Sequence, residues 1–80
     1  MTRIVIYTRH DCHLCDEAKA AVARATAGLG VKVVKVDVDT DPALRERFGH
    51  EVPVVFIDDH KAFKFRVDEA RLLRRLRRGA

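Results

Sequence analysis

Residues 3–15 have the sequence RIVIYTRHDCHLC, in which an apolar segment leads through a polar loop to a pair of cysteines. Its first part, Arg3–Tyr7, is rich in β-branched residues and almost wholly apolar, which predicts a buried strand. A helix is expected from Cys12 or His13 to about Ala27, because apolar side chains recur there at helical spacing. These apolar residues are Leu14, Ala18, Ala21, Val22 and Ala25. The two cysteines therefore stand where a strand ends and a helix begins.

The middle of the chain predicts a second strand and a second, short helix. Alternating valines over residues 31–38 indicate a strand with one solvated face or edge. Asp41 and Pro42 suit the N-cap and the first position of a short helix that ends at Gly49. A strand–helix–strand start favours a right-handed crossover, so the first two strands are expected to pair in parallel.

The C-terminal third predicts a β-hairpin and a last helix. Residues 54–57 and 62–65 are strand-like and flank a polar turn over residues 58–60, with Phe63 and Phe65 alternating as expected core residues. Asp68 suits the N-cap of a helix that runs to about Arg78. The order is β-α-β-α-β-β-α, which predicts a single α/β domain over residues 1–80 with a mixed four-stranded sheet.

Length and composition exclude several classes of protein. A chain of 80 residues has room for one small domain. Leu, Ile, Val and Phe make up 24 of these residues, which is too many for a disordered chain. The longest apolar runs are far shorter than the roughly 20 residues of a membrane helix, and no signal-peptide pattern opens the sequence. We therefore expect a monomer in the cytoplasm that contacts no membrane.

The segment Cys12-His13-Leu14-Cys15 contains the two cysteines, which are the candidate reactive residues of this sequence. The start of a helix stabilises a thiolate, which is the reactive form of cysteine. Cys12, at the exposed start of the helix, is expected to attack a disulfide, and the more covered Cys15 is expected to resolve the mixed disulfide. His13 and Arg9 lie near enough in sequence to add positive charge beside Cys12. His13 is therefore a candidate for tuning the thiol pKa, although both residues are equally compatible with solvated positions.

A metal carrier is the alternative interpretation of the same pair. His10, Cys12, His13 and Cys15 are residue types that bind zinc, but all four fall within six residues, which hinders a tetrahedral site. Copper(I) held by the two thiolates alone is the simpler version of this alternative. Small copper chaperones also place C-x-x-C between a strand and a helix, but they end in a strand, whereas this chain is predicted to end in a helix.

Val52 and Pro53 precede the apolar run of the hairpin. A proline cannot donate a hydrogen bond to a sheet, so it is expected at the start of an edge strand, where a trans peptide bond is the commoner state. A cis Val52–Pro53 bond is the other interpretation, and it would turn the backbone of Val52 outward to pair with an extended substrate.

Three segments in this order resemble the thioredoxin superfamily, and at this length its glutaredoxin branch. The segments are residues 7–15, 36–39 and 52–57, and the resemblance extends over residues 3–78. It is strongest to the short glutaredoxin-like redoxins, here with a Cys-His-Leu-Cys active site. The resemblance implies a thioredoxin-like (glutaredoxin-type) fold and a thiol–disulfide oxidoreductase that reduces protein or small-molecule disulfides.

The resemblance also implies roles for individual residues. Cys12 would be the nucleophile and Cys15 the resolving thiol. Pro53 would be a cis-proline beside them, and the backbone of Val52 would bind the substrate or glutathione. Arg9 falls near the place where glutaredoxins often carry a lysine that meets a glutathione carboxylate.

The sequence departs from the family pattern at three places, one of which is the absence of a tryptophan before Cys12. His13-Leu14 stands between the cysteines, in place of the Pro-Tyr of typical glutaredoxins. The Gly-Gly that glutaredoxins carry after the hairpin is absent, and Arg66-Val67 precede Asp68 instead. No bound cofactor is expected, and the electron donor is open between glutathione, another thiol and a thioredoxin-reductase-type flavoenzyme.

The last predicted helix carries a cationic face. Its arginines recur at helical spacing, and the leucines of the same segment, Leu72, Leu73 and Leu76, are expected to pack on the sheet. A solvated face that complements the helix dipole is the first interpretation, and an acidic protein partner is the second. Nucleic acid is not expected, because exposed aromatic residues do not accompany the charge. The arginines are Arg71, Arg74, Arg75 and Arg78.

Overall fold

The computed structural model, which describes residues 2–78, confirms the predicted order of elements and the mixed four-stranded sheet. The strands lie in the order β2-β1-β3-β4. β1 pairs in parallel with β2 and antiparallel with β3, and β4 continues the hairpin at the edge. The elements are β1 (Arg3–Thr8), α1 (His13–Thr26), β2 (Lys32–Asp37), the short 3₁₀ turn η1 (Val38–Thr40), α2 (Pro42–Phe48), β3 (Val54–Ile57), β4 (His60–Lys64) and α3 (Glu69–Arg78).

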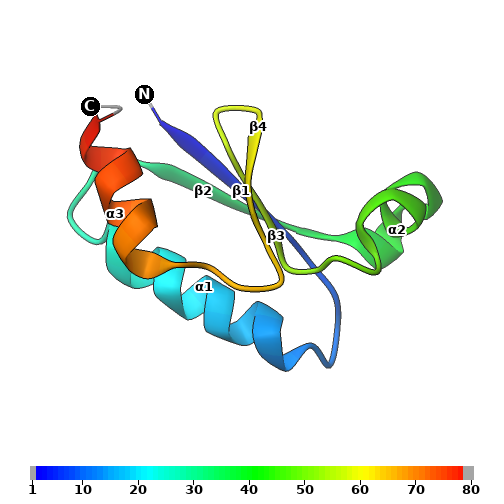
Figure 1. Cartoon of the computed structure of the whole chain (residues 1–80). Coiled ribbons are helices and arrows are strands. Elements are labelled where there is room, and N and C mark those ends of the chain that lie inside the picture. The colour runs from blue at the N-terminus through cyan, green and yellow to red at the C-terminus, as the bar shows by residue number, and fades with distance from the viewer. Residues whose placement is uncertain (1, 79–80) are drawn as a thin grey trace.

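In Figure 1, α1 runs below the sheet and α3 packs against α1 at the left, whereas α2 lies at the right, on the side toward which the start of α1 and the two cysteines also lie. The main core is formed where β1 and β3 meet α1 and α3. Its buried side chains are Ile4, Ile6, Val22, Ala25, Val55, Ile57, Leu72 and Leu76. The predicted docking of the last helix through Leu72 and Leu76 is thereby confirmed, and Leu73 packs at the edge of this core.

A second, aromatic cluster packs beside α2. The ring of Tyr7 stacks on that of Phe48 at 4.6 Å between centroids, and Phe56 meets both rings edge-on. Asp41 caps α2 by accepting a hydrogen bond from the N–H of Ala43 at 2.9 Å, as its sequence predicts. This cluster packs the end of β1, at Tyr7, against α2 and β3.

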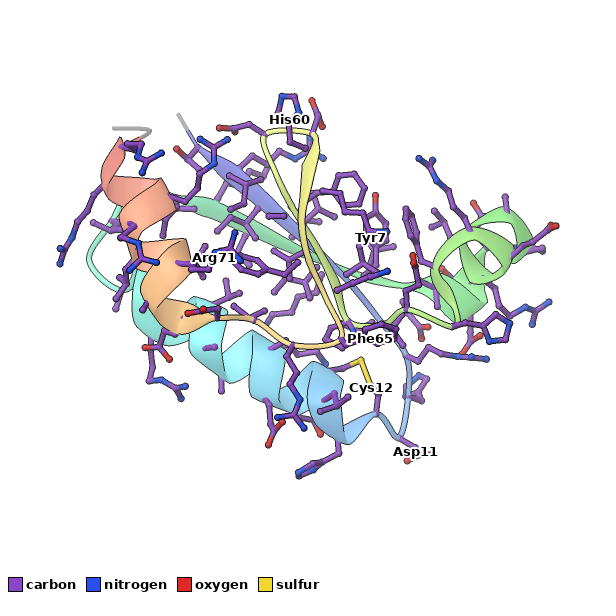
Figure 2. The ribbon with its side chains drawn as sticks, in the orientation of Figure 1. Tyr7, Asp11, Cys12, His60, Phe65 and Arg71 are labelled. Atoms are coloured by element: carbon purple, nitrogen blue, oxygen red, sulfur yellow. A yellow bond between two sulfur atoms is a disulfide. The ribbon has the colours of Figure 1, made fainter. Side chains whose placement is uncertain are left out.

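The hairpin differs from its prediction at both ends. β4 begins at His60, because the turn consists of only two residues, Asp58 and Asp59, both with positive φ. The predicted core position of Phe65 is wrong: the residue follows the end of β4, has a φ of +67° and is 44% exposed. Figure 2 labels it at the base of the hairpin. Phe63 does pack against the core.

Among residues 2–78, no helix combines the length and the apolar character that crossing a membrane requires.

Candidate thiol–disulfide site

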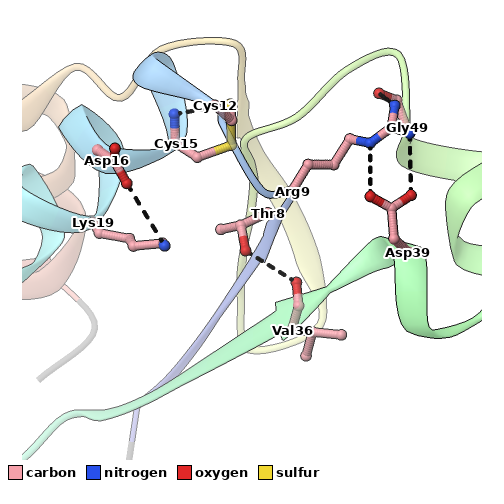
Figure 3. Close-up of a disulfide and its surroundings, with 9 residues drawn as sticks. All are labelled: Thr8, Arg9, Cys12, Cys15, Asp16, Lys19, Val36, Asp39 and Gly49. Atoms are coloured by element: carbon pink, nitrogen blue, oxygen red, sulfur yellow. Dashed lines mark hydrogen bonds and ion pairs between the residues drawn. A yellow bond between two sulfur atoms is a disulfide. The ribbon is translucent and has the colours of Figure 1, made fainter.

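Cys12 and Cys15 form a disulfide at the N-terminus of α1, with 5.2 Å between their Cα atoms (Figure 3). Cys12 is the N-cap residue of the helix and has an extended backbone. Its sulfur accepts a hydrogen bond from the backbone N–H of Cys15 at 3.1 Å. This N–H belongs to the first turn of the helix, where backbone donors have no acceptor within the helix. Cys12 Sγ serves as the acceptor for this N–H.

The two cysteine residues differ in their exposure to solvent. Cys15 is fully buried, with 0% exposure, whereas Cys12 is partly exposed. The N–H of Cys15 and the positive end of the helix dipole are both directed at Cys12, an arrangement that favours a thiolate on this sulfur when the pair is reduced. The sequence predicts this difference in exposure, and the structure has it; the roles of nucleophile and resolving thiol stay predictions.

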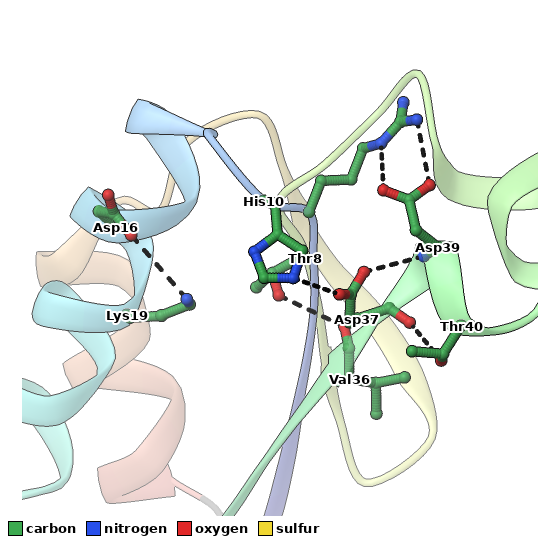
Figure 4. A network of polar contacts seen from close by, with 9 residues as sticks. Thr8, His10, Asp16, Lys19, Val36, Asp37, Asp39 and Thr40 are labelled. Carbon is green, nitrogen blue, oxygen red and sulfur yellow. Dashed lines mark hydrogen bonds and ion pairs between the residues drawn. The ribbon is translucent and has the colours of Figure 1, made fainter.

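Arg9 lies in the loop between β1 and α1 and is held by the protein itself. Its Nε and Nη2 contact the two carboxylate oxygens of Asp39, each at 3.1 Å, and its Nη1 donates to the carbonyl of Gly49 at 3.3 Å. Figure 3 shows this pair, and Figure 4 shows Asp39 beside the polar contacts of Asp37, His10 and Thr40. In the oxidised form described here, Arg9 thus ties the active-site loop to η1 and to the end of α2.

The two histidines near the cysteines each meet a carboxylate. Nε2 of His10 lies 3.2 Å from Asp37, and Nε2 of His13 lies 3.6 Å from Glu17, one helical turn along α1. Both imidazoles are exposed. In the part of the chain that the structure describes, no three His, Cys, Asp or Glu side chains are grouped as metal ligands. The four-ligand zinc arrangement is therefore not formed here.

The Val52–Pro53 peptide bond is cis, which decides between the two states that the sequence leaves open. Pro53 is buried, and Val52 is partly exposed. Within residues 2–78, neither the backbone N–H nor the carbonyl of Val52 forms a hydrogen bond of the fold. The backbone of Val52 is therefore available to a bound partner.

Two residues that sequence reasoning did not single out complete this region. The N–H of Phe65 donates to the carbonyl of Pro53 at 2.9 Å and contacts the carbonyl of Glu51 at 3.3 Å. The Glu51 carboxylate in turn meets Lys61 at 2.9 Å and Lys64 at 3.6 Å. The hydrogen bond from Lys61, with the charges of both lysines, holds the pKa of Glu51 below its usual value. Glu51 and Phe65 thus fasten the proline segment to the hairpin.

Comparison with known proteins identifies the family. The profile of the Glutaredoxin-like domain (DUF836) family matches residues 3–77. The chain belongs to this glutaredoxin-like family, and its fold is the thioredoxin-like fold.

Individual relatives agree with this assignment. An uncharacterized protein of Mycobacterium tuberculosis is 32% identical over 75 residues, which cover 88% of this chain and 77% of the relative. A solved Xanthomonas campestris protein is 36% identical with a TM-score of 0.77, over 94% of this chain and 96% of that chain. The NrdH-redoxin of Escherichia coli, described as a glutaredoxin-like protein with a thioredoxin-like activity profile, is 33% identical with a TM-score of 0.61, over 92% and 93% of the two chains. With the C-x-x-C pair, these likenesses support a thiol–disulfide redox function.

Proposed function

We propose that this protein is a dithiol–disulfide oxidoreductase that uses Cys12 as the nucleophile and Cys15 as the resolving thiol. The observation that carries the proposal is the placement of the pair. Cys12 Sγ lies at the start of α1 and accepts the N–H of Cys15 at 3.1 Å, and Cys12 is partly exposed, whereas Cys15 is fully buried. A buried thiol next to an accessible one favours attack on an external disulfide by the accessible sulfur.

The reaction consists of two exchange steps. The Cys12 thiolate attacks one sulfur of a substrate disulfide, forms a mixed disulfide and releases the other substrate sulfur as a thiolate. Cys15, once deprotonated, then attacks Cys12 Sγ, which closes the Cys12–Cys15 disulfide and releases the second substrate sulfur. The substrate gains two electrons and two protons, and the protein loses them. A thiol donor or a flavoenzyme reductase regenerates the dithiol.

The backbone of Val52 supports the binding of an extended substrate. Its N–H and carbonyl have no hydrogen-bond partner within residues 2–78. A substrate segment that lies antiparallel to Val52 satisfies both groups, in the manner of strand addition to a sheet edge. Arg9 is a second proposed substrate contact: a carboxylate of the substrate would compete with Asp39 for its guanidinium. His13 is proposed to act on Cys12 only through its charge, because its ring lies against Glu17.

A further proposal concerns the cationic face of α3. The arginine groove, a hollow of about 360 Å³ between β4 and α3, has four arginines over an apolar floor. Within residues 2–78 none of the four forms an ion pair with a carboxylate. We propose that an acidic protein segment binds there. The groove is lined by Arg71, Arg74, Arg75, Arg78, Ile57, Ala62 and Phe63.

A single-turnover experiment tests the oxidoreductase. Fully reduced protein is mixed with excess bis(2-hydroxyethyl) disulfide, and the products are followed by mass spectrometry, so that no electron donor is needed. The wild type is expected to form the Cys12–Cys15 disulfide. Cys12→Ser is expected to be inert, and its matched control, Cys15→Ser, is expected to stop at the mixed disulfide on Cys12. A Cys12→Ser protein that reacts at the wild-type rate would contradict the proposal. Tight copper(I) binding by a wild type that does not react would favour the metal carrier instead.

A further inference from the structure

β4 is an edge strand of the sheet, and its outer side faces no other strand in the part of the chain that the structure describes. The strand order is β2-β1-β3-β4, so β4 pairs with β3 alone. An open hollow of about 340 Å³ lies along β4 and is lined by residues 61–64 of the strand itself. The outward N–H and carbonyl groups of an edge strand can pair with a further strand. β4 therefore offers backbone hydrogen bonds as well as side chains.

Basic side chains flank this edge on both faces of the sheet. On the face that carries α3, the arginine groove lies between α3 and β4, with Phe63 on its floor. On the other face, the ammonium groups of Lys61 and Lys64 share the carboxylate of Glu51. The edge thus combines the four arginines and two lysines with one carboxylate, so a segment that lies along β4 meets an excess of positive charge.

The four arginines of the groove repel one another. They recur three and four residues apart on α3, and like charges at these spacings destabilise a helix. Over residues 2–78, no carboxylate neutralises them. Acidic side chains in the groove would relieve the repulsion. A second copy of this chain would not, because it brings the same edge lysines and a net charge of +4.

The spacing of the arginines matches the spacing of side chains on one face of a strand. Arg71 and Arg75 are one helical turn apart, as are Arg74 and Arg78, and one turn spans about 6 Å along the helix axis at 1.5 Å per residue. Alternate residues of a strand are about 6.6 Å apart. Figure 2 labels Arg71 on the side of α3 that faces the hairpin. Acidic residues at alternate positions of an extended segment therefore fit arginines one turn apart.

We infer that the arginine groove and the free edge of β4 together bind an extended acidic segment of a partner protein, which joins the sheet as a fifth strand. This inference rests on the acidic partner proposed above for the groove, and it adds the conformation of that partner and the pattern of its sequence. Main-chain hydrogen bonds align the segment with β4, and its alternate acidic side chains pair with the arginines. The irregular register of β4 opposite Val55 and Phe56 keeps this ladder short, so the ion pairs contribute much of the affinity.

Four labelled peptides test the inference by fluorescence anisotropy at low salt. The first alternates glutamate and valine over seven residues, and the second contains the same residues as one block of glutamates and one block of valines. The other two have the alternating sequence, with N-methyl groups on all the glutamates in one peptide and on all the valines in the other. Alternate N–H groups of a strand point to opposite edges, so only one of the two methylated peptides loses the hydrogen bonds to β4.

Strand addition predicts a preference for one pattern and one edge. The alternating peptide is expected to bind about tenfold more tightly than the block peptide. One methylated peptide is expected to lose about tenfold in affinity, because hydrogen bonds to β4 are blocked, and the other to stay within about threefold of the parent peptide.

Two double variants of the protein locate the binding site. Arg74→Glu together with Arg75→Glu is expected to weaken binding of the alternating peptide about tenfold. The matched control is Lys32→Glu together with Arg77→Glu, which changes the net charge equally at exposed residues that do not line the groove. This control is expected to weaken binding by less than about threefold.

Each failure has its own meaning. Equal affinities of the two methylated peptides, or of the alternating and block peptides, overturn strand addition and leave the acidic partner of the groove standing. A control variant that weakens binding as much as the groove variant shows attraction by net charge alone, which overturns both the acidic partner and the inference. Absence of binding by every peptide overturns both as well. The single-turnover reaction of Cys12 is measured separately, so the proposed oxidoreductase stands or falls on its own experiment.

Discussion

Reduction of the Cys12–Cys15 disulfide is expected to leave this protein folded and only slightly less stable. The disulfide closes a loop of four residues, from Cys12 to Cys15. In the chain-entropy account of cross-links, a loop of this length stabilises the folded state by roughly 2 kcal/mol. Neither core cluster contains a cysteine, so the packing that holds α1 and α3 on the sheet does not depend on the bond.

The hydrogen bond at the start of α1 further reduces the difference in stability between the oxidised and the reduced protein. The N–H of Cys15 that now meets Cys12 Sγ at 3.1 Å remains available to the reduced sulfur. A hydrogen bond to a charged group is worth about 1.5–3 kcal/mol, so ionisation of Cys12 stabilises the folded, reduced protein. The gap between the two redox forms is therefore expected to shrink as the pH rises through the ionisation of Cys12.

Urea unfolding of the oxidised and reduced proteins at pH 7 measures this gap. For a domain of this size the slope is about 1 kcal/mol/M, so the oxidised form is expected to unfold at a urea concentration higher by no more than about 2 M. The variant with both Cys12→Ser and Cys15→Ser, which has no redox chemistry, should unfold close to the reduced form. A reduced protein that is unfolded without urea, or a gap above about 4 kcal/mol, would refute the reasoning. The disulfide would then be a structural cross-link and not one state of a redox couple.

Three further predictions concern single features of the structure. In the reduced protein, iodoacetamide is expected to modify Cys12 much faster than the buried Cys15, with half-maximal rate below about pH 8.5, the ordinary pKa of a free thiol; equal rates at the two cysteines would contradict the assigned roles. Because the fold lowers the pKa of Glu51, the ionised carboxylate stabilises the folded state at pH values above 4.5, the usual pKa of a glutamate. This contribution is lost as the pH falls below 4.5 and through the lowered pKa of Glu51. Glu51→Gln should therefore lower the urea midpoint at pH 7 and have little effect near pH 3; an equal loss at both pH values would argue against an ionic contribution. An oligo-glutamate peptide should bind the arginine groove at low salt, with affinity reduced about tenfold by Arg74→Glu together with Arg75→Glu in fluorescence anisotropy, and binding that survives both changes would place the acidic partner elsewhere.

Local signals explain why so much of the fold was predictable from the sequence. The N-cap at Asp41, the proline after it and the helical stripe of α1 each act within a few residues, and the structure has the expected elements at those places. The position of Cys12 at a helix start follows from the same local pattern. Only the ends of elements shift, as where β2 ends at Asp37 and η1 follows it.

The remaining features of the site depend on partners that are distant in sequence. Arg9 meets Asp39 and Gly49, 30 and 40 residues away, so its sequence position alone does not reveal that it is already engaged. The cis state of the Val52–Pro53 bond was likewise left open by the sequence, because either state satisfies the local pattern.

The error at Phe65 has a specific physical cause. Strict alternation from Phe63 predicts a second core residue, but it assumes that the strand continues, whereas β4 ends at Lys64 and the next residue is left-handed. The backbone N–H of Phe65 still reaches the carbonyl of Pro53, so the ladder is completed while the ring turns to the surface beside Leu14. The sequence pattern describes what a side chain can pack against within its own fold. Residue 65 is therefore the place where the alternation pattern fails, because its backbone completes the ladder after the strand itself has ended.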